Sequence, residues 1–222
     1  MDTNIKFRRS HAFEGKSYEG VDMAGLRKLA VKDLFEAQQE IGPVANMSRY
    51  NMNSKAFLSV LASMAAEKPR SFFTTLKGED GMGLTNRVKR MLNAIEEEEA
   101  ERDGMIIKIT RPGAFGKKLD LTRLDEMTAD EFAQAEEALD MAEWGSTGGL
   151  DSFNYKYCCA VAAFALNPDK PEKQLQKLMD APFWLGNLVQ GIVKDFFLRS
   201  GSMDEGETEN PEASGKTSSE SP

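Results

Sequence analysis

Apolar residues recur along the chain with two different spacings, and the same order of spacings occurs twice. Residues 5–9 and 105–111 have the pattern of short strands, and turn residues such as Glu14-Gly15 then lead to a second extended piece. Farther on, apolar residues recur every three to four positions, as they do in amphipathic helices. The most apolar helices are expected over residues 56–66 and 155–166, each followed by a proline, a short helix and a final helix.

An internal repeat relates the two halves. Residues 5–16 read IKFRRSHAFEGK and residues 107–118 read IKITRPGAFGKK, with six identical residues in twelve. Unrelated segments of this length would share fewer than about one, at a residue frequency of roughly one in twenty. Further matching pairs are Asp22 with Asp120, Leu26 with Leu124, Leu29 with Met127, and Lys68-Pro69 with Lys170-Pro171. The sequence therefore predicts a mainly α (α+β) fold of two tandem helical units, residues 1–95 and 105–200, each headed by a short β-hairpin.

A helix-start signal follows the hairpin in each copy. In the second copy Thr128 precedes Glu131 by three residues, which is the capping-box arrangement. The first copy has Ala30 and Asp33 at the matching positions, so we expect a weaker cap there.

Charge adds two polar segments to this organisation. The chain has 222 residues, 28 Lys and Arg against 36 Asp and Glu, and a net charge of -8. Most of the negative charge lies in residues 96–104, which we expect to be an acidic linker, and in residues 201–222. The latter carry six acids, one Lys and almost no large apolar residue, so they are predicted to be a disordered tail.

The apolar stretches are short, which argues against a membrane protein. None approaches the roughly 20 residues that a transmembrane helix needs. The N-terminus lacks the apolar region of a secretory signal, so an intracellular, cytoplasmic location is expected.

Reactive residue types are scarce. His11 is the single histidine and its counterpart is Gly113, so we interpret it as a surface turn residue. Cys158 and Cys159 are chain neighbours, which is poor geometry for a disulfide, and they are expected to be buried structural thiols. The run of glutamates at 96–99 is interpreted as solvated rather than metal-binding. We therefore predict no catalytic, cofactor-binding or metal-binding residue, and no enzyme.

Direct binding to nucleic acid is not expected either. The first unit has a small excess of basic residues, but no helix-turn-helix, zinc or RNA-binding pattern accompanies it.

Adjacent aromatic pairs are the remaining candidates for a binding site. They are Phe72 with Phe73, Phe183 with Trp184, and Phe196 with Phe197. In one interpretation, one member of each pair packs in the core of its unit and the other seals the contact between the units. In the other, some of them line a groove for an apolar helix of another protein.

This arrangement of hairpin, helices and polar tail resembles the tail assembly chaperones of long-tailed bacteriophages. The resemblance rests on the basic hairpin IKFRRSHAFEGKSYEGVDM, the series Leu26, Leu29, Asp33, Leu34, and the short helix KPRSFFTTL before a terminal helix. The second copy repeats it through KPEKQLQKLMDAPFWLGNLVQGIVKDFFL. It covers residues 5 to about 200 and is a similarity of hydrophobic pattern, and a tandem pair departs from the usual single domain.

The resemblance implies a protein that binds the tape-measure protein, recruits tail-tube subunits, and leaves before the virion is complete. It would act in the cytoplasm of an infected bacterial cell, and one chain could replace a dimer or associate with itself. The alternative is a structural or scaffolding virion component, or a protein-binding adaptor, built from the same duplicated unit.

Overall fold

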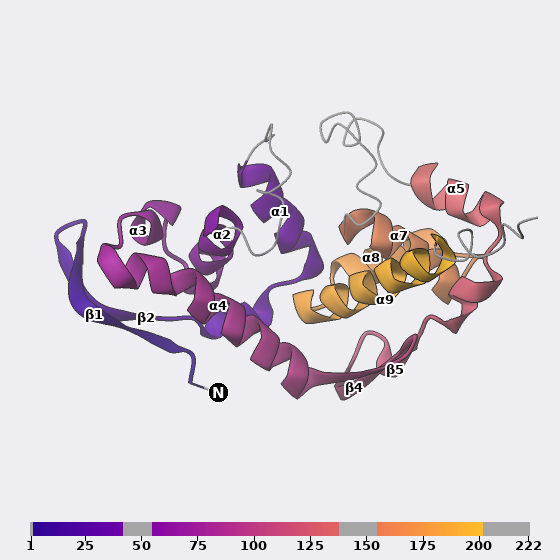
Figure 1. Ribbon diagram of the computed structural model, residues 1–222, viewed down its shortest axis with the longest axis horizontal. Coiled ribbons are helices and arrows are strands. Elements are labelled where there is room, and N and C mark those ends of the chain that lie inside the picture. Colours follow the sequence, from indigo (N-terminus) through magenta and orange to yellow (C-terminus); the bar gives the residue numbers. More distant parts are fainter. Residues whose placement is uncertain (1, 42–54, 138–154, 202–222) are drawn as a thin grey trace, which may run out of the picture.

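The fold is mainly helical, with two small antiparallel sheets, as expected. The computed structural model describes residues 2–41, 55–137 and 155–201 (Figure 1). The first unit consists of β1 (Asn4–Phe13), β2 (Lys16–Asp22), the 3₁₀ helix η1 (Ala24–Lys28), α1 (Val31–Ile41), α2 (Lys55–Ala66), α3 (Arg70–Thr74) and α4 (Gly78–Glu99). After β3 (Ala100–Asp103), the second unit consists of β4 (Ile106–Gly113), β5 (Gly116–Asp120), the 3₁₀ helix η3 (Thr122–Glu126), α5 (Ala129–Glu137), α7 (Tyr155–Leu166), α8 (Pro171–Met179) and α9 (Phe183–Gly201).

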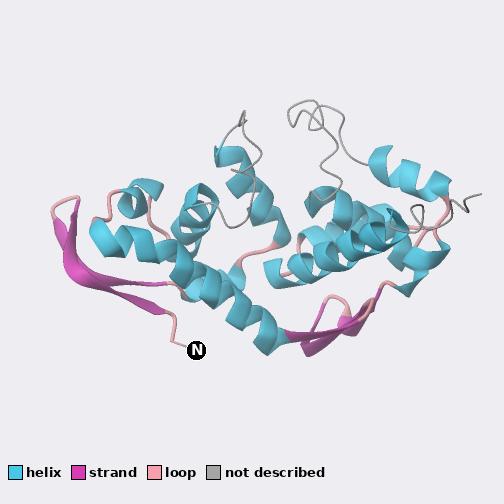
Figure 2. Cartoon of the chain, in the orientation of Figure 1, coloured by secondary structure: helices cyan, strands magenta, loops and turns pink. Residues whose placement is uncertain are grey.

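The two hairpins have the same construction. Ile5 lies opposite Val21 in the first, and Ile107 lies opposite Leu119 in the second. Each ladder becomes irregular after its third residue pair. All four of these side chains are buried, and each hairpin contacts α4 through its first strand (Figure 2). The repeat seen in the sequence is therefore also a repeat of strand register.

Helix capping also agrees with the sequence. The Thr128 N–H donates to Glu131 Oε2 at 2.9 Å, and the Glu131 N–H donates back to Thr128 Oγ1 at 3.2 Å, which completes the expected capping box. In the first unit the Ala30 N–H donates to Asp33 Oδ2 at 2.7 Å. Because alanine has no side-chain acceptor, only half of the box forms there.

One hydrophobic core extends through both units, and a short backbone contact joins them. The Val31 N–H donates to the Ala181 carbonyl at 2.9 Å, and the Phe183 N–H donates to the Leu29 carbonyl at 2.9 Å. We call this pairing of residues 29–31 with 181–183 the joint. Beside it, Gly186 of α9 packs against the Val31 side chain. The joint places α1 of the first unit next to α9 of the second (Figure 1).

The acidic segment at 96–104 takes regular structure over most of its length. Its glutamates form the last turn of α4, and Ala100–Asp103 pairs with β4 as an additional strand. Glu99 is only 8% exposed, because Arg27 Nη1 donates to its Oε1 at 2.7 Å and Arg111 Nη1 lies 3.4 Å from the same oxygen. These arginines supply the opposite charge that lets the segment take regular structure.

Two further expectations concern membrane-spanning helices and the C-terminal tail. Within residues 2–41, 55–137 and 155–201, none of the helices combines the length and apolar character that crossing a membrane requires. The acidic tail at 202–222 lies outside the described residues.

Candidate functional site

The neighbouring cysteines are packed inside α7. Cys158 and Cys159 are both fully buried, which confirms the expected position for structural thiols. Burial raises the pKa of Cys158, and it raises the pKa of Cys159 to about 12. Both therefore remain protonated at neutral pH, and neither has the low pKa that a nucleophilic or redox-active thiol needs.

The position of His11 corrects the sequence interpretation. β1 continues past residue 9, so His11 lies within the strand and is 8% exposed, not a surface turn residue. Its ring packs edge-on against Phe72 of α3 at a centroid distance of 4.8 Å and lies close to Phe7 and Phe13. Its Nε2 atom has no hydrogen-bond partner among the described residues. His11 is thus part of the aromatic core between the first hairpin and α3.

Four of the six aromatic residues proposed for partner binding are inaccessible. Phe72, Phe73, Phe183 and Trp184 are each at most 6% exposed. These four therefore do not line an open groove, because their side chains are buried. Phe183 lies at the joint, which agrees with the alternative that one member of a pair packs between the units.

The third pair is only partly buried. Phe196 and Phe197 lie near the end of α9, and both rings contact Phe132 of α5, with centroid distances of 5.9 and 5.6 Å. Tyr157 of α7 stacks on Phe197 at 6.0 Å, and the next residue of α9, Leu198, is 55% exposed. We call Phe132, Phe196, Phe197 and Leu198 the aromatic end. Of the proposed aromatic pairs, it is the one that remains at the surface.

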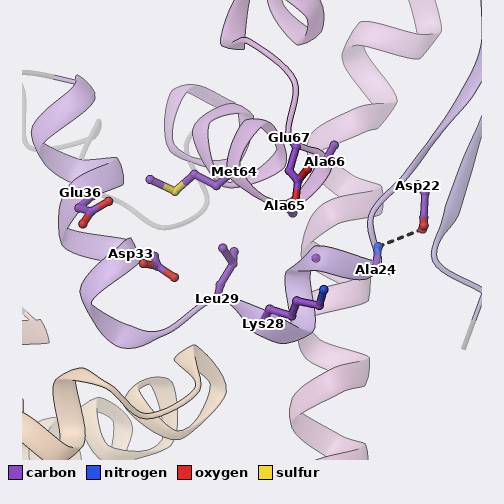
Figure 3. Close-up of a pocket in the computed structure, with 11 residues that line it drawn as sticks. Asp22, Ala24, Lys28, Leu29, Asp33, Glu36, Met64, Ala65, Ala66 and Glu67 are labelled. Atoms are coloured by element: carbon purple, nitrogen blue, oxygen red, sulfur yellow. Dashed lines mark hydrogen bonds between the residues drawn. The ribbon is translucent and has the colours of Figure 1, made fainter.

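A pocket of about 530 Å³ lies in the first unit between η1, α1 and the last turn of α2 (Figure 3). Leu29 and Met64 are the large apolar side chains of its lining, and Gly25 also lines it. The complete lining is Asp22, Ala24, Gly25, Lys28, Leu29, Asp33, Glu36, Met64, Ala65, Ala66 and Glu67. Because Asp22, Ala24, Lys28 and Glu36 are exposed, the pocket opens to solvent.

The pocket is negatively charged, with four carboxylates against one lysine. Hydrogen bonds from Thr3 and from the Ala24 N–H lower the pKa of Asp22. Asp33 uses Oδ2 to cap α1, and within the described chain no donor reaches its Oδ1 or the Glu36 carboxylate. In the same part of the chain, no three His, Cys, Asp or Glu side chains are grouped so as to hold a metal ion.

Comparison of the chain with protein-family models, curated proteins and solved structures gives no match. The candidate site therefore rests on its own geometry. That geometry gives an acidic, partly apolar pocket with unused oxygen acceptors, which suits a cationic side chain better than a neutral ligand.

The sequence analysis missed this pocket. Its lining residues come from three separated segments and match no spacing of a known site. The available signal was a difference between the copies, since Gly25 stands opposite Arg123 when Asp22 and Leu26 are aligned with Asp120 and Leu124.

Proposed function

We propose that this chain is a non-enzymatic protein-binding protein, a bacteriophage tail assembly chaperone that binds the tape-measure protein and recruits tail-tube subunits. The observation that carries the proposal is the duplicated unit. Hairpin, 3₁₀ helix, amphipathic helix, apolar helix, short helix and long helix recur in the same order in both halves. The sequence resemblance to the chaperones rests on this same order.

The aromatic end is the proposed contact surface for an apolar helix of the client. Exposed large apolar side chains are few among the described residues, and Leu198 is one of two, the other being Met82 in α4. Leu198 directly follows the half-buried Phe196 and Phe197 in α9, whereas Met82 follows Gly81 in a polar part of α4. Clustered aromatic and aliphatic groups are the usual anchors of a helix-binding surface.

Co-expression with a client tests the proposal. The client is the tape-measure protein that the proposal implies, and the readout is the amount of client that stays soluble and co-purifies. We expect Leu198→Glu to reduce co-purification about tenfold, because the carboxylate would have to be buried against an apolar helix. Met82→Glu makes the same chemical change at an exposed apolar position of the other unit, and it should leave co-purification unchanged.

Analysis of purified virions distinguishes a chaperone from a structural or scaffolding component. A chaperone acts in the host cytoplasm and is absent from finished particles, so mass spectrometry of purified virions should not detect it. Its presence there in fixed proportion to the tube protein would instead identify a structural or scaffolding component. An equal loss of client with both glutamate variants would remove the aromatic end as the contact surface.

A further inference from the structure

Arg123 of the second unit lies between two helices that correspond to those lining the pocket of the first unit. It shows how a guanidinium can fit in such an arrangement. Its Nη1 donates to the Phe164 carbonyl, in the last turn of α7, at 2.9 Å. Its Nη2 donates to Glu131 Oε1, in the first turn of α5. The planar guanidinium group thus connects the carbonyl end of one helix to a carboxylate at the start of another.

The first unit has the same elements but no such side chain. η1 corresponds to η3, Asp33 to Glu131, and the last turn of α2 to the last turn of α7. Gly25 replaces Arg123, and a Cβ on Gly25 would lie 2.0 Å from the Ala65 carbonyl oxygen. The backbone of η1 therefore approaches α2 too closely for any side chain at this position, and the space beside it is the pocket.

The acceptors that hold Arg123 in the second unit have counterparts in the pocket. Asp33 lines the pocket with its Oδ1 unused, and Met64, Ala65 and Ala66 of the last turn of α2 line it at the negative end of that helix dipole. Glu36, at the position of Gln134, adds a further negative charge one turn along α1.

We propose that this pocket binds the side chain of an arginine presented by a partner polypeptide. Arginine fits better than lysine, because the acceptors lie on two different elements and a guanidinium can donate to both at once. The apolar side chains of Leu29 and Met64 in the lining would cover the aliphatic stem of the bound side chain. The pocket would serve any partner with a suitable arginine, so this inference stands independently of the chaperone proposal.

Neither basic residue of η1 takes the place of Arg123 in this pocket. The adjacent Arg27 points away and pairs with Glu98 and Glu99 of α4. Lys28 lines the pocket, but its side chain is exposed and no described carboxylate pairs with it.

A peptide titration of the full-length, isotope-labelled protein followed by NMR tests the proposal. The probes are the pentapeptide acetyl-Ala-Ala-Arg-Ala-Ala-amide, the same peptide with citrulline, and free arginine. Citrulline keeps the shape of arginine but has no charge. We expect the arginine peptide to shift the amide signals of Gly25, Asp33 and Ala65 saturably, and the citrulline peptide to bind about tenfold more weakly.

Matched variants locate the interaction. Glu36→Gln and Glu40→Gln remove the same charge one turn apart on α1, but only Glu36 lines the pocket. Asp33→Asn removes a charge while its amide oxygen can still accept the Ala30 N–H. We expect Asp33→Asn combined with Glu36→Gln to abolish the saturable response, and Glu40→Gln to leave it within about twofold.

The second unit supplies the reciprocal experiment. In Arg123→Ala the vacated site should bind the arginine peptide, with new signal shifts around Glu131 and Phe164. Should this variant fail to fold, the titration of the native protein still decides. Equal binding of arginine and citrulline peptides, shifts outside the pocket, or equal effects of the Glu36 and Glu40 variants would each overturn the proposal. Free arginine binding as tightly as the pentapeptide would overturn the assignment to a polypeptide partner.

Discussion

Replacing Gly186 by alanine tests whether the two units are packed together as described. Gly186 lies in α9 beside the joint, and an alanine Cβ there would lie 2.6 Å from Cγ2 of Val31. Val31 cannot move away easily, because it is fully buried and its N–H donates to the Ala181 carbonyl. Its β-branched side chain also has few alternative rotamers.

Two opposing effects set the size of the change. Alanine inside a helix is favoured over glycine by about 1 kcal/mol. Overpacking of a close contact costs about 1–3 kcal/mol. Since the neighbour is stiff, we expect Gly186→Ala to lower the free energy of unfolding by about 1–2 kcal/mol. Gly83 of α4 is the control, because its nearest neighbour is the Arg87 Nε atom at 3.9 Å, so Gly83→Ala should raise stability by about 0.5–1 kcal/mol.

Urea unfolding of the two variants provides the measurement, since an unchanged m-value shows that the midpoint reports stability. Val31→Ala removes the atom that an alanine at 186 would meet. In that background the Gly186→Ala change should become neutral or stabilising, giving a coupling energy of about 1–3 kcal/mol. If Gly186→Ala stabilised the native protein as much as Gly83→Ala does, the packing of α9 on Val31 would be refuted.

Three further predictions concern local features. Thr128→Ala should destabilise the protein by about 1 kcal/mol in the same urea assay through loss of the α5 cap, whereas Ala30→Thr should not be destabilising. Cys158 and Cys159 should resist a thiol reagent at pH 8 in the native protein and react rapidly in denaturant, and fast native labelling would contradict their burial. The contact with Lys118 and the hydrogen bonds from Thr122 lower the pKa of Asp120 from 3.8 to about 2. The contribution of the Asp120 carboxylate to stability is therefore present above about pH 4 and lost as the pH falls toward 2. Asp120→Asn should make the melting temperature less dependent on pH over this range.

Much of the fold follows from local pattern. The strand starts, the two-residue turn at Glu14-Gly15 and the cap at Thr128 depend on nearby residues, and the structure has each of them. The sequence predictions fail where the surroundings of a residue come from other elements of the fold. Whether Glu99 is solvated depends on Arg27, which is far away in the sequence, and on Arg111 of β4.

The pocket could not be predicted in the same way, because it forms where the backbone of η1 approaches the end of α2 closely. No residue type near Gly25 indicates that η1 will rest on the end of α2. The internal repeat helps only once both copies are seen in three dimensions. Arg123 then shows what kind of group the shared arrangement of elements can hold.

The joint shows why two copies of one unit are not interchangeable. Alignment of the terminal helices on Leu84 and Leu185 matches residues 181–183 with residues 80–82. In the second unit α8 is longer and α9 begins later, so the backbone at 181–183 is free to pair with residues 29–31. In the first unit α4 has already begun at Gly78, and its helix uses those backbone groups. The Asp80 side chain there accepts the Arg8 N–H at 2.9 Å and so holds β1. The backbone pairing at the joint therefore cannot be repeated by residues 80–82 at the outer end of the first unit.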